Sequence, residues 1–266
     1  MWESAVELSN SVAGDVVVVS RDGAVGNIVL NRSAAMNAIT VDLGMRLEQG
    51  LRELAESVAV IVLRGAGGNF SVGGDFDEVE RLRRIGPAAL YPLFENFGRA
   101  CSAIAEIDVP VVAAVEGYAL AGGFELMQAS DIVLVSNDAK IADMHSNFGM
   151  VPGGGGSQRL ARLVGRQRAL AHILTGDRLS AAEAVSWGLA YRNYEPAEFN
   201  EAVREFGLRL ASKSPRALRT VKRLVHDGLG KPLADGLAME IDAVVAHLGD
   251  QDGGSAFEKF VTRKRS

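Results

Sequence analysis

Residues 110–126 read PVVAAVEGYALAGGFEL and decide the fold of this chain. Val109–Val115 is an unbroken apolar run rich in β-branched residues, which predicts a strand buried on both faces. Three glycines follow this strand, and Gly123–Ala129 then has a helical pattern. Tight turns alone can explain such glycines, but glycines between a strand and a helix also let a ligand approach free backbone N–H groups.

The flanking sequence repeats the alternation of strand and helix. Val58–Leu63 and Ile132–Val135 are further apolar runs of strand length, and Ala88–Ile107 is a helical pattern between two of the predicted strands. Strands that alternate with helices pair in parallel through right-handed crossovers. Nearer the N-terminus, Val16–Ser20 and Asn27–Asn31 are predicted to be adjacent strands joined by a turn. The sequence therefore predicts an α/β fold.

The last third of the chain predicts helices only. Their expected ranges are Gln167–Leu174, Ala181–Trp187, Ala197–Ala211, Arg216–His226, Leu233–His247 and Gly254–Arg263. In the first third, Thr40 is expected to cap a helix that runs to about Ala55. We expect residues 1–195 to form the α/β core and residues 196–266 a helical region that packs on this core or on another subunit.

Composition narrows the class of protein. The 266 residues carry 28 Lys+Arg and 33 Asp+Glu, a net charge of −5, and 48% of them are hydrophobic. This apolar content excludes a mainly disordered chain, and the acidic balance lacks the electrostatic footprint of nucleic-acid binding. The single cysteine excludes an internal disulfide framework. The 4 histidines lack the spacing of a metal site, so we expect no metal.

The sequence also predicts the location of the protein. Its first residues include Glu3 and Glu7 and lack the basic and apolar segments of a secretion signal. No apolar run approaches the ~20 residues that cross a bilayer. We therefore expect a cytoplasmic protein with no membrane or nucleic-acid partner.

About a dozen of the 30 glycines fall in three clusters. Gly65–Gly74 follows the strand Val58–Leu63, the second cluster lies in residues 117–123, and the third is Gly153–Gly156. None has the spacing of a dinucleotide-binding loop, a phosphate-binding loop or a nucleophile elbow. Chemistry based on backbone dipoles and a few acid or base side chains is therefore favoured.

Four segments in series resemble the crotonase superfamily of enoyl-CoA hydratases and isomerases. FSVGGD at 70–75 is similar to its F-x-x-G-x-D segment, and residues 110–126 are similar to its P-V-I-A-A-V-x-G-x-A-x-G-G-G-x-E-L block. Residues 151–160 and 175–184 match the two segments that follow. The resemblance implies an α/β fold with a crotonase-like ββα spiral core and a C-terminal helical trimerisation region.

The resemblance assigns an oxyanion hole to the backbone N–H groups of Gly74 and Gly122 and a catalytic role to Glu125. Two fixed N–H donors stabilise the negative charge on the carbonyl oxygen of a thioester that forms an enolate. Glu125 follows Gly122 by three residues, in the first turn of the predicted helix. Read without the family, Glu125 is equally an acidic residue well placed on the helix dipole.

The sequence departs from the family at the second catalytic carboxylate. Counted back from Pro152 and Gly153, the family's second glutamate falls on His145, with Asp143 two residues earlier. Histidine, with an ordinary pKa of ~6.5, can act as an acid or base near neutral pH, but it cannot fully reproduce a two-carboxylate clamp on water. His145 is therefore either a second catalytic residue or a residue that only lines the pocket.

The resemblance also implies where coenzyme A binds. Asn31–Ala38 is similar to the N-R-P-x-x-x-N-A segment, which implies contacts at Arg32, Ala34 and Met36, and the AFEK tail implies contacts at Phe257 and Lys259. Large apolar side chains are candidates for the acyl pocket, although core-packing helices show the same spacing. These candidates are Phe76, Leu82, Tyr91, Phe94 and Phe97.

In function, the resemblance implies an enzyme that hydrates a 2-enoyl-CoA, or dehydrates the product, through a thioester enolate. Coenzyme A would enter as part of the acyl-CoA substrate, and we expect no separate cofactor. Three alternatives stay open on this fold: double-bond isomerisation, decarboxylation or C–C cleavage of an acyl-CoA, and acyl-CoA binding without catalysis. The family further implies a homotrimer or a dimer of trimers.

Overall fold

A computed structural model describes residues 7–8 and 14–250 of the chain. Contacts between residues divide the chain into two compact units, with the boundary after Ser212. The sequence placed the start of the helical region at residue 196, where helix α8 (Pro196–Ala211) begins. In the structure α8 packs on the sheet of the first unit, because it buries Phe199, Val203 and Phe206 there.

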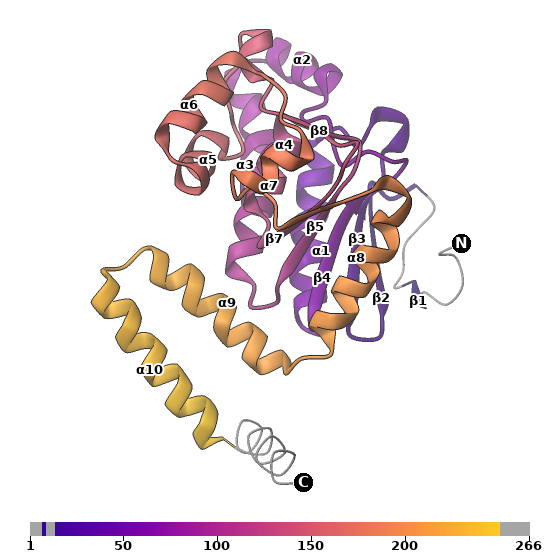
Figure 1. The fold of residues 1–266 in the computed structure, drawn as a ribbon. Helices are drawn as coiled ribbons and strands as arrows, with labels where there is room; N and C mark the ends of the chain where they lie inside the picture. The colour runs from indigo at the N-terminus through magenta and orange to yellow at the C-terminus, as the bar shows by residue number, and fades with distance from the viewer. Residues whose placement is uncertain (1–6, 9–13, 251–266) are drawn as a thin grey trace. The chain divides into compact units, whose positions relative to one another are not determined.

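Among the described residues, a seven-stranded sheet forms the centre of the first unit (Figure 1). Its order is β1-β2-β3-β4-β5-β7-β9, with antiparallel pairing from β1 to β3 and parallel pairing from β3 to β9. Its strands are β1 (Glu7–Leu8), β2 (Val17–Asp22), β3 (Val25–Leu30), β4 (Val60–Gly65), β5 (Val111–Val115), β7 (Ile132–Ser136) and β9 (Arg192–Tyr194). The predicted hairpin and parallel pairing are thus confirmed.

The apolar runs that predicted β4 and β5 are buried on both faces of the sheet. Along β5, Val111, Ala113 and Val115 face one apolar cluster and Val112 and Ala114 face the other. This alternation follows from the two-residue period of a strand. Helices α1 (Val41–Ala55) and α3 (Pro87–Glu106) contribute to the first cluster, and α8 covers the second.

Most of the predicted helices are present. The Thr40 hydroxyl accepts the Leu43 N–H at 3.1 Å, so Thr40 caps α1 as expected. The other predicted helices that the structure describes are α3, α4 (Gly122–Ala129), α6 (Arg166–Thr175), α7 (Ala181–Ser186), α8, α9 (Pro215–Leu229) and α10 (Leu233–Gly249). The predicted helix Gly254–Arg263 lies outside the described residues.

Several elements were not predicted. Helices α2 (Phe76–Ile85) and α5 (Gly156–Val164) were missed, as was a two-stranded sheet of β6 (Tyr118–Leu120) and β8 (Lys140–Ala142). The prediction of helices alone after residue 167 is wrong at β9, which pairs in parallel with β7. β6, β8 and β9 have three residues each, so their sequence patterns are too short to detect. Their pairing is set by neighbours in the folded protein.

The second unit contains α9 and α10, which pack against each other. Ser214 caps α9 by accepting the Ala217 N–H at 3.3 Å. Apolar side chains on this pair are exposed within one chain: Val221, Val225, Leu229, Leu233, Leu237, Ile241, Val244, Val245 and Leu248. Among the described residues, no helix has the length and apolar content needed to cross a membrane.

Candidate active site

Two glycine loops meet at the carboxyl ends of β4 and β5. Ser71 holds them together, because its N–H donates to the Tyr118 carbonyl at 2.8 Å and its own carbonyl accepts the Leu120 N–H at 3.0 Å. The loops touch at Gly73: a β-carbon there would lie 3.0 Å from the Gly122 nitrogen. Glycine at this position therefore lets residues 73–74 and 121–122 come together at one place.

The backbone N–H groups of Gly74 and Gly122 are both available at this junction. The strand bridge with Ile39 uses the Gly73 carbonyl and the Asp75 N–H, and leaves the N–H of Gly74 without an acceptor among the described residues. Gly122 is the first residue of α4, where N–H groups have no partner inside the helix. Both glycines line the same cavity, so the structure brings the two predicted oxyanion donors together.

Ala121 has a backbone conformation that normally requires glycine. Its φ is 46° and its ψ is −116°, and its N–H donates to the Ala142 carbonyl at 3.0 Å, which ties the loop to β8. A non-glycine residue with such angles is strained by roughly 1–3 kcal/mol. The alanine here occupies the first of the three glycine positions of the family pattern.

We expect Ala121→Gly to raise the free energy of unfolding by about 1 kcal/mol, because the relieved strain exceeds the added chain entropy of glycine. Denaturant unfolding measures this change. Ala119→Gly is the matched control: Ala119 is fully buried in β6, so the same substitution is expected to destabilise the protein. A loss of stability in Ala121→Gly would contradict the prediction.

Glu125 lies in the first turn of α4 and is only 2% exposed. Its Oε1 accepts the backbone N–H groups of Gly154 and Gly156, each at 2.8 Å. Burial raises the pKa of this carboxyl above its ordinary value, although the two N–H bonds and the nearby His145 act in the opposite direction. A carboxyl with a raised pKa that faces a cavity is suited to acid–base chemistry.

The loop that binds Glu125 is the third glycine cluster. Arg159 donates from Nη1 to the Gly154 carbonyl at 2.6 Å, and so fixes the peptide groups beside Glu125. A β-carbon on Gly154 would lie 2.2 Å from the Phe97 ring. The glycines thus allow the loop to run between the carboxylate and an aromatic side chain.

His145 lies beside Glu125 and is hydrogen-bonded to Asp143. Its Nδ1 lies 2.8 Å from Oδ1 of Asp143, and its backbone N–H donates to the same oxygen at 3.3 Å. Burial lowers the pKa of the imidazole, but the hydrogen bond and charge of Asp143 and the charge of Glu125 together raise it above its ordinary value. The structure therefore brings the predicted pair of Glu125 and His145 into one site and adds Asp143.

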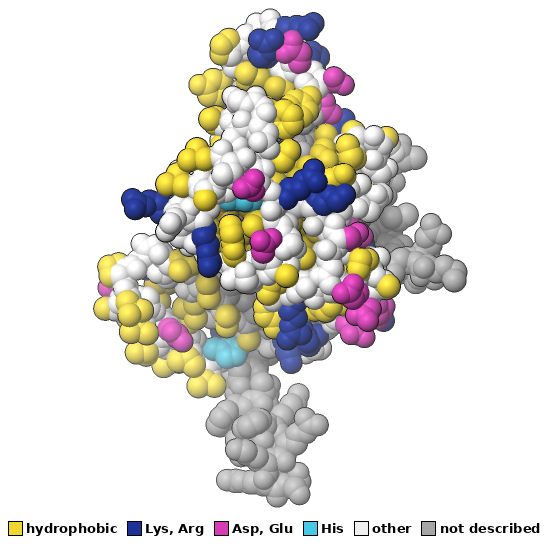
Figure 2. Space-filling view, turned by 45° about the horizontal axis from the view of Figure 1, so that its top comes forward, with side chains coloured by type: hydrophobic (Ala, Val, Ile, Leu, Met, Phe, Trp, Pro, Cys, Tyr) yellow, Lys and Arg dark blue, Asp and Glu magenta, His cyan; other side chains and the backbone are white. Residues whose placement is uncertain are grey.

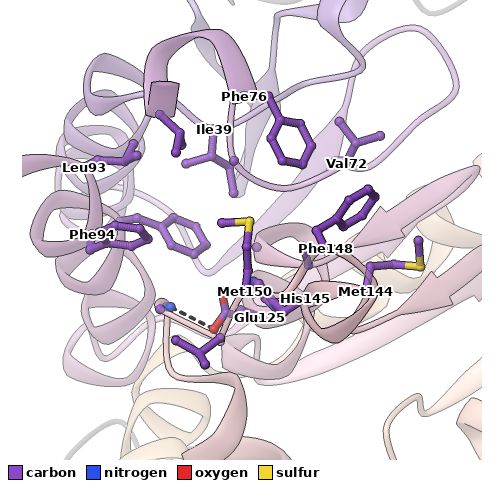
Figure 3. Close-up of a pocket in the computed structure, with 18 residues that line it drawn as sticks. Ile39, Val72, Phe76, Leu93, Phe94, Glu125, Met144, His145, Phe148 and Met150 are labelled. Carbon is purple, nitrogen blue, oxygen red and sulfur yellow. Dashed lines mark hydrogen bonds between the residues drawn. The ribbon is translucent and has the colours of Figure 1, made fainter. Parts of the chain in front are cut away.

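The cavity around these groups is apolar. Figure 3 shows Glu125 and His145 on one side of it and Ile39, Val72 and Phe76 on the other. Its wall is completed by side chains from other segments, among them Leu93, Phe94, Phe97, Met144, Phe148 and Met150. In Figure 2, apolar side chains gather in the upper half of the face turned forward, and charged side chains lie both at its edges and near its centre.

The candidates for the acyl pocket divide into two groups. Phe76, Phe94 and Phe97 line the cavity, whereas Leu82 and Tyr91 are not among its lining residues. Sequence reasoning missed Phe148, which packs edge-on against Phe76 with ring centroids 5.5 Å apart. The two rings are 72 positions apart in sequence (148 − 76), so no local pattern links them.

The predicted coenzyme A contacts lie in different surroundings. Ala34 and Met36 belong to an exposed turn around the short helix Ser33–Ala35, and the Met36 carbonyl accepts the N–H of Val72 in the cavity wall at 3.2 Å. Arg32 instead donates to Asp75 at 2.9 Å and to the Ala38 carbonyl. Phe257 and Lys259 lie outside the described residues.

Cys101 is buried and does not line the cavity. Burial raises the pKa of the Cys101 thiol to about 12, which leaves it protonated. Among residues 7–8 and 14–250, no three His, Cys, Asp or Glu side chains are grouped as metal ligands.

Comparison with known proteins identifies the family. The sequence profile of the family described as "Enoyl-CoA hydratase/isomerase" matches residues 20–265. The chain belongs to this family. It is thus an enzyme of the enoyl-CoA hydratase/isomerase family, and the predicted membership of the crotonase superfamily is confirmed.

Relatives of this family enzyme match it along nearly its whole length. A protein named probable enoyl-CoA hydratase from Rhizobium meliloti is 32% identical over 254 residues, which is 95% of this chain and 97% of the relative. The short-chain-enoyl-CoA hydratase of Clostridium acetobutylicum is 29% identical over 252 residues, or 94% and 95%.

The fold comparison agrees. The crystal structure of an enoyl-CoA hydratase from Bacillus anthracis superimposes with a TM-score of 0.88 at 29% identity, and covers 93% of this chain and 96% of that one. The predicted crotonase-like α/β fold is therefore confirmed. The role of the C-terminal helices in trimerisation stays a prediction.

Proposed function

We propose that the enzyme adds water across the double bond of a 2-enoyl-CoA and catalyses the reverse dehydration. The observation that carries this proposal is Glu125: a buried carboxylate with a raised pKa, in an apolar cavity, beside two backbone N–H groups that have no acceptor among the described residues. The hydratase names of the relatives support the same reaction.

In the proposed step, Glu125 takes a proton from water while the water oxygen bonds to C3 of the substrate. The C2–C3 π electrons move to form an enolate, whose oxygen accepts the N–H groups of Gly74 and Gly122. His145 then gives a proton to C2, which completes the 3-hydroxyacyl thioester. The proton held by Glu125 returns through solvent to His145, so that no oxidant, reductant or separate cofactor is consumed.

Coenzyme A binding is a further part of the proposal. The exposed turn with Ala34 and Met36 borders the cavity through Val72 and is suited to contact the pantetheine and adenine parts of the substrate. Arg32 shapes this turn, and pairing with a coenzyme A phosphate would require release of Asp75. Phe257 and Lys259 stay predictions from the resemblance.

Assembly and location are also proposals. The exposed apolar side chains of α9 and α10 suit an interface between copies of the chain, as a homotrimer or dimer of trimers would need. A cytoplasmic location is proposed from the sequence alone.

A panel of CoA thioesters in water enriched in oxygen-18 tests the reaction. We expect 2-enoyl-CoA to gain one labelled water, with kcat/KM at least about tenfold above that for any other thioester. Liquid chromatography coupled to mass spectrometry would report isomerisation of a 3-enoyl-CoA as a separate peak of unchanged mass, and decarboxylation of a malonyl-type thioester as loss of carbon dioxide. Dominance of either reaction, or binding without turnover, would overturn the proposal.

A further inference from the structure

Asp143 lies behind His145, away from the cavity wall. Strand β8 ends at Ala142, and Asp143 follows it with no exposed surface. Its Oδ1 accepts the backbone N–H of His145 and lies 2.8 Å from the ring Nδ1 of the same residue. Asp143 is not among the residues that line the cavity, whereas His145 is.

The backbone between these two residues is shaped for this contact. Met144 has a left-handed conformation, with φ 63° and ψ −16°. Such a conformation is unfavourable for a methionine and persists only where the surroundings impose it. The turn brings the Asp143 carboxylate back onto the imidazole two residues later.

The charges around the imidazole come from two elements. Asp143 follows β8 and Glu125 belongs to α4; His172 on α6 is also influenced by the charge of Asp143. The second oxygen of Asp143, Oδ2, is buried and has no hydrogen-bond partner among the described residues. A buried carboxylate is costly unless a cation balances it, and a protonated His145 supplies that charge.

We propose that Asp143 is a positioning residue, which fixes the imidazole of His145 through Nδ1–H so that Nε2–H faces the substrate as a proton donor. No described residue bonds to Nε2, and the ring lines the cavity. This inference rests on the proposed function. It gives the site a carboxylate and an imidazolium in place of the two carboxylates of the family pattern.

The test is the pH profile of Asp143→Asn. Hydration needs His145 protonated, so kcat/KM is lost as pH rises through the pKa of His145. Loss of the negative charge of Asp143 lowers this pKa, so the basic limb is expected to move to lower pH by about one unit. The acid limb, set by Glu125, moves less, because burial, the two N–H bonds and His145 each affect the pKa of Glu125 more than Asp143 does. We expect kcat to fall about 10- to 100-fold with little change in KM.

A double-mutant cycle separates positioning from a structural role. In a His145→Gln background, Asp143→Asn is expected to lower kcat less than threefold, because Asp143 acts only through His145. Asp138→Asn is the matched control: this exposed carboxylate bonds to Ser136 outside the cavity, and its removal should leave the profile unchanged. An unshifted basic limb, or an equal loss in both backgrounds, would overturn the inference.

A measurement on the unmutated enzyme covers the case in which Asp143→Asn does not fold. In histidine labelled with nitrogen-15, the His145 ring, assigned by its absence in His145→Gln, is expected to carry its proton on Nδ1 when neutral. A neutral ring protonated on Nε2 alone would overturn the inference. Failure of the thioester panel would instead overturn the proposed function, so the two failures are distinguishable.

Discussion

Replacement of Glu125 by glutamine is expected to lower kcat for hydration by roughly 10³-fold, because the proposed base can no longer accept a proton from water. The change should leave the fold intact. The glutamine carbonyl oxygen can still accept the N–H groups of Gly154 and Gly156, which bond to a single oxygen in the native carboxylate. Stopped assays that follow loss of the enoyl thioester measure the effect.

Glu116→Gln is the matched control for this experiment. Glu116 lies after β5 and pairs with Arg64 at 3.2 Å, away from the cavity. Its loss is expected to leave kcat within a factor of about three, because Glu116 does not line the cavity. The effect on stability is also expected to be small, since a partly exposed ion pair contributes ~1 kcal/mol or less. Thermal unfolding and coenzyme A binding should be similar in all three proteins. Hydration that persists at the native rate in Glu125→Gln would refute the assigned role.

Gly73→Ala is expected to lower kcat by about 10²-fold, the effect typical of losing one oxyanion donor. Gly73 has a φ of 95°, and an added β-carbon would lie 2.8 Å from the Ala121 β-carbon and 3.0 Å from the Gly122 nitrogen. The two loops must therefore separate, which moves the N–H groups of Gly74 and Gly122 apart. The ratio of kcat values, with KM measured separately, tests this expectation.

Gly68→Ala is the control for the effect of backbone strain alone. Gly68 also has a positive φ, of 73°, but it is exposed and nothing lies within 4 Å of an added β-carbon. This variant is expected to lose stability of about 1 kcal/mol and to keep its kcat. Equal losses of kcat in Gly73→Ala and Gly68→Ala would show that strain, rather than the geometry of the donors, limits the reaction.

The parts of the site that the sequence predicted are local in the chain. Gly122 and Glu125 follow the end of the buried strand β5 within ten residues, so one strand–loop–helix pattern places both of them, while their roles came from the family resemblance. The meeting of Gly74 with Gly122 was predicted only through the family resemblance. It depends on the bridge between Ser71 and Ala119, which joins segments 48 positions apart (119 − 71).

Other parts of the site could not be predicted from the sequence, because they depend on residues far apart in the chain or on unusual backbone angles. The bond between Asp143 and His145 requires the left-handed Met144, which no residue pattern predicts. The family resemblance implied that Arg32 contacts coenzyme A, yet its guanidinium donates to Asp75, which lies 43 residues later in the chain. Helix α2 is different: Asp75 caps it, and its apolar residues Phe76, Val79, Leu82 and Ile85 recur at helical spacing, so the sequence carried the signal and the prediction missed it.

The two N–H bonds to Oε1 leave Glu125 with a single working oxygen, since no described residue bonds to Oε2. A carboxylate held in this way cannot rotate to accept a proton at a second position in the cavity. His145 lies on the same side of the cavity (Figure 3), so attacking water and donated proton would reach the same face of a flat enoyl group. In the proposed hydration, this arrangement would therefore give a single enantiomer of the 3-hydroxyacyl thioester.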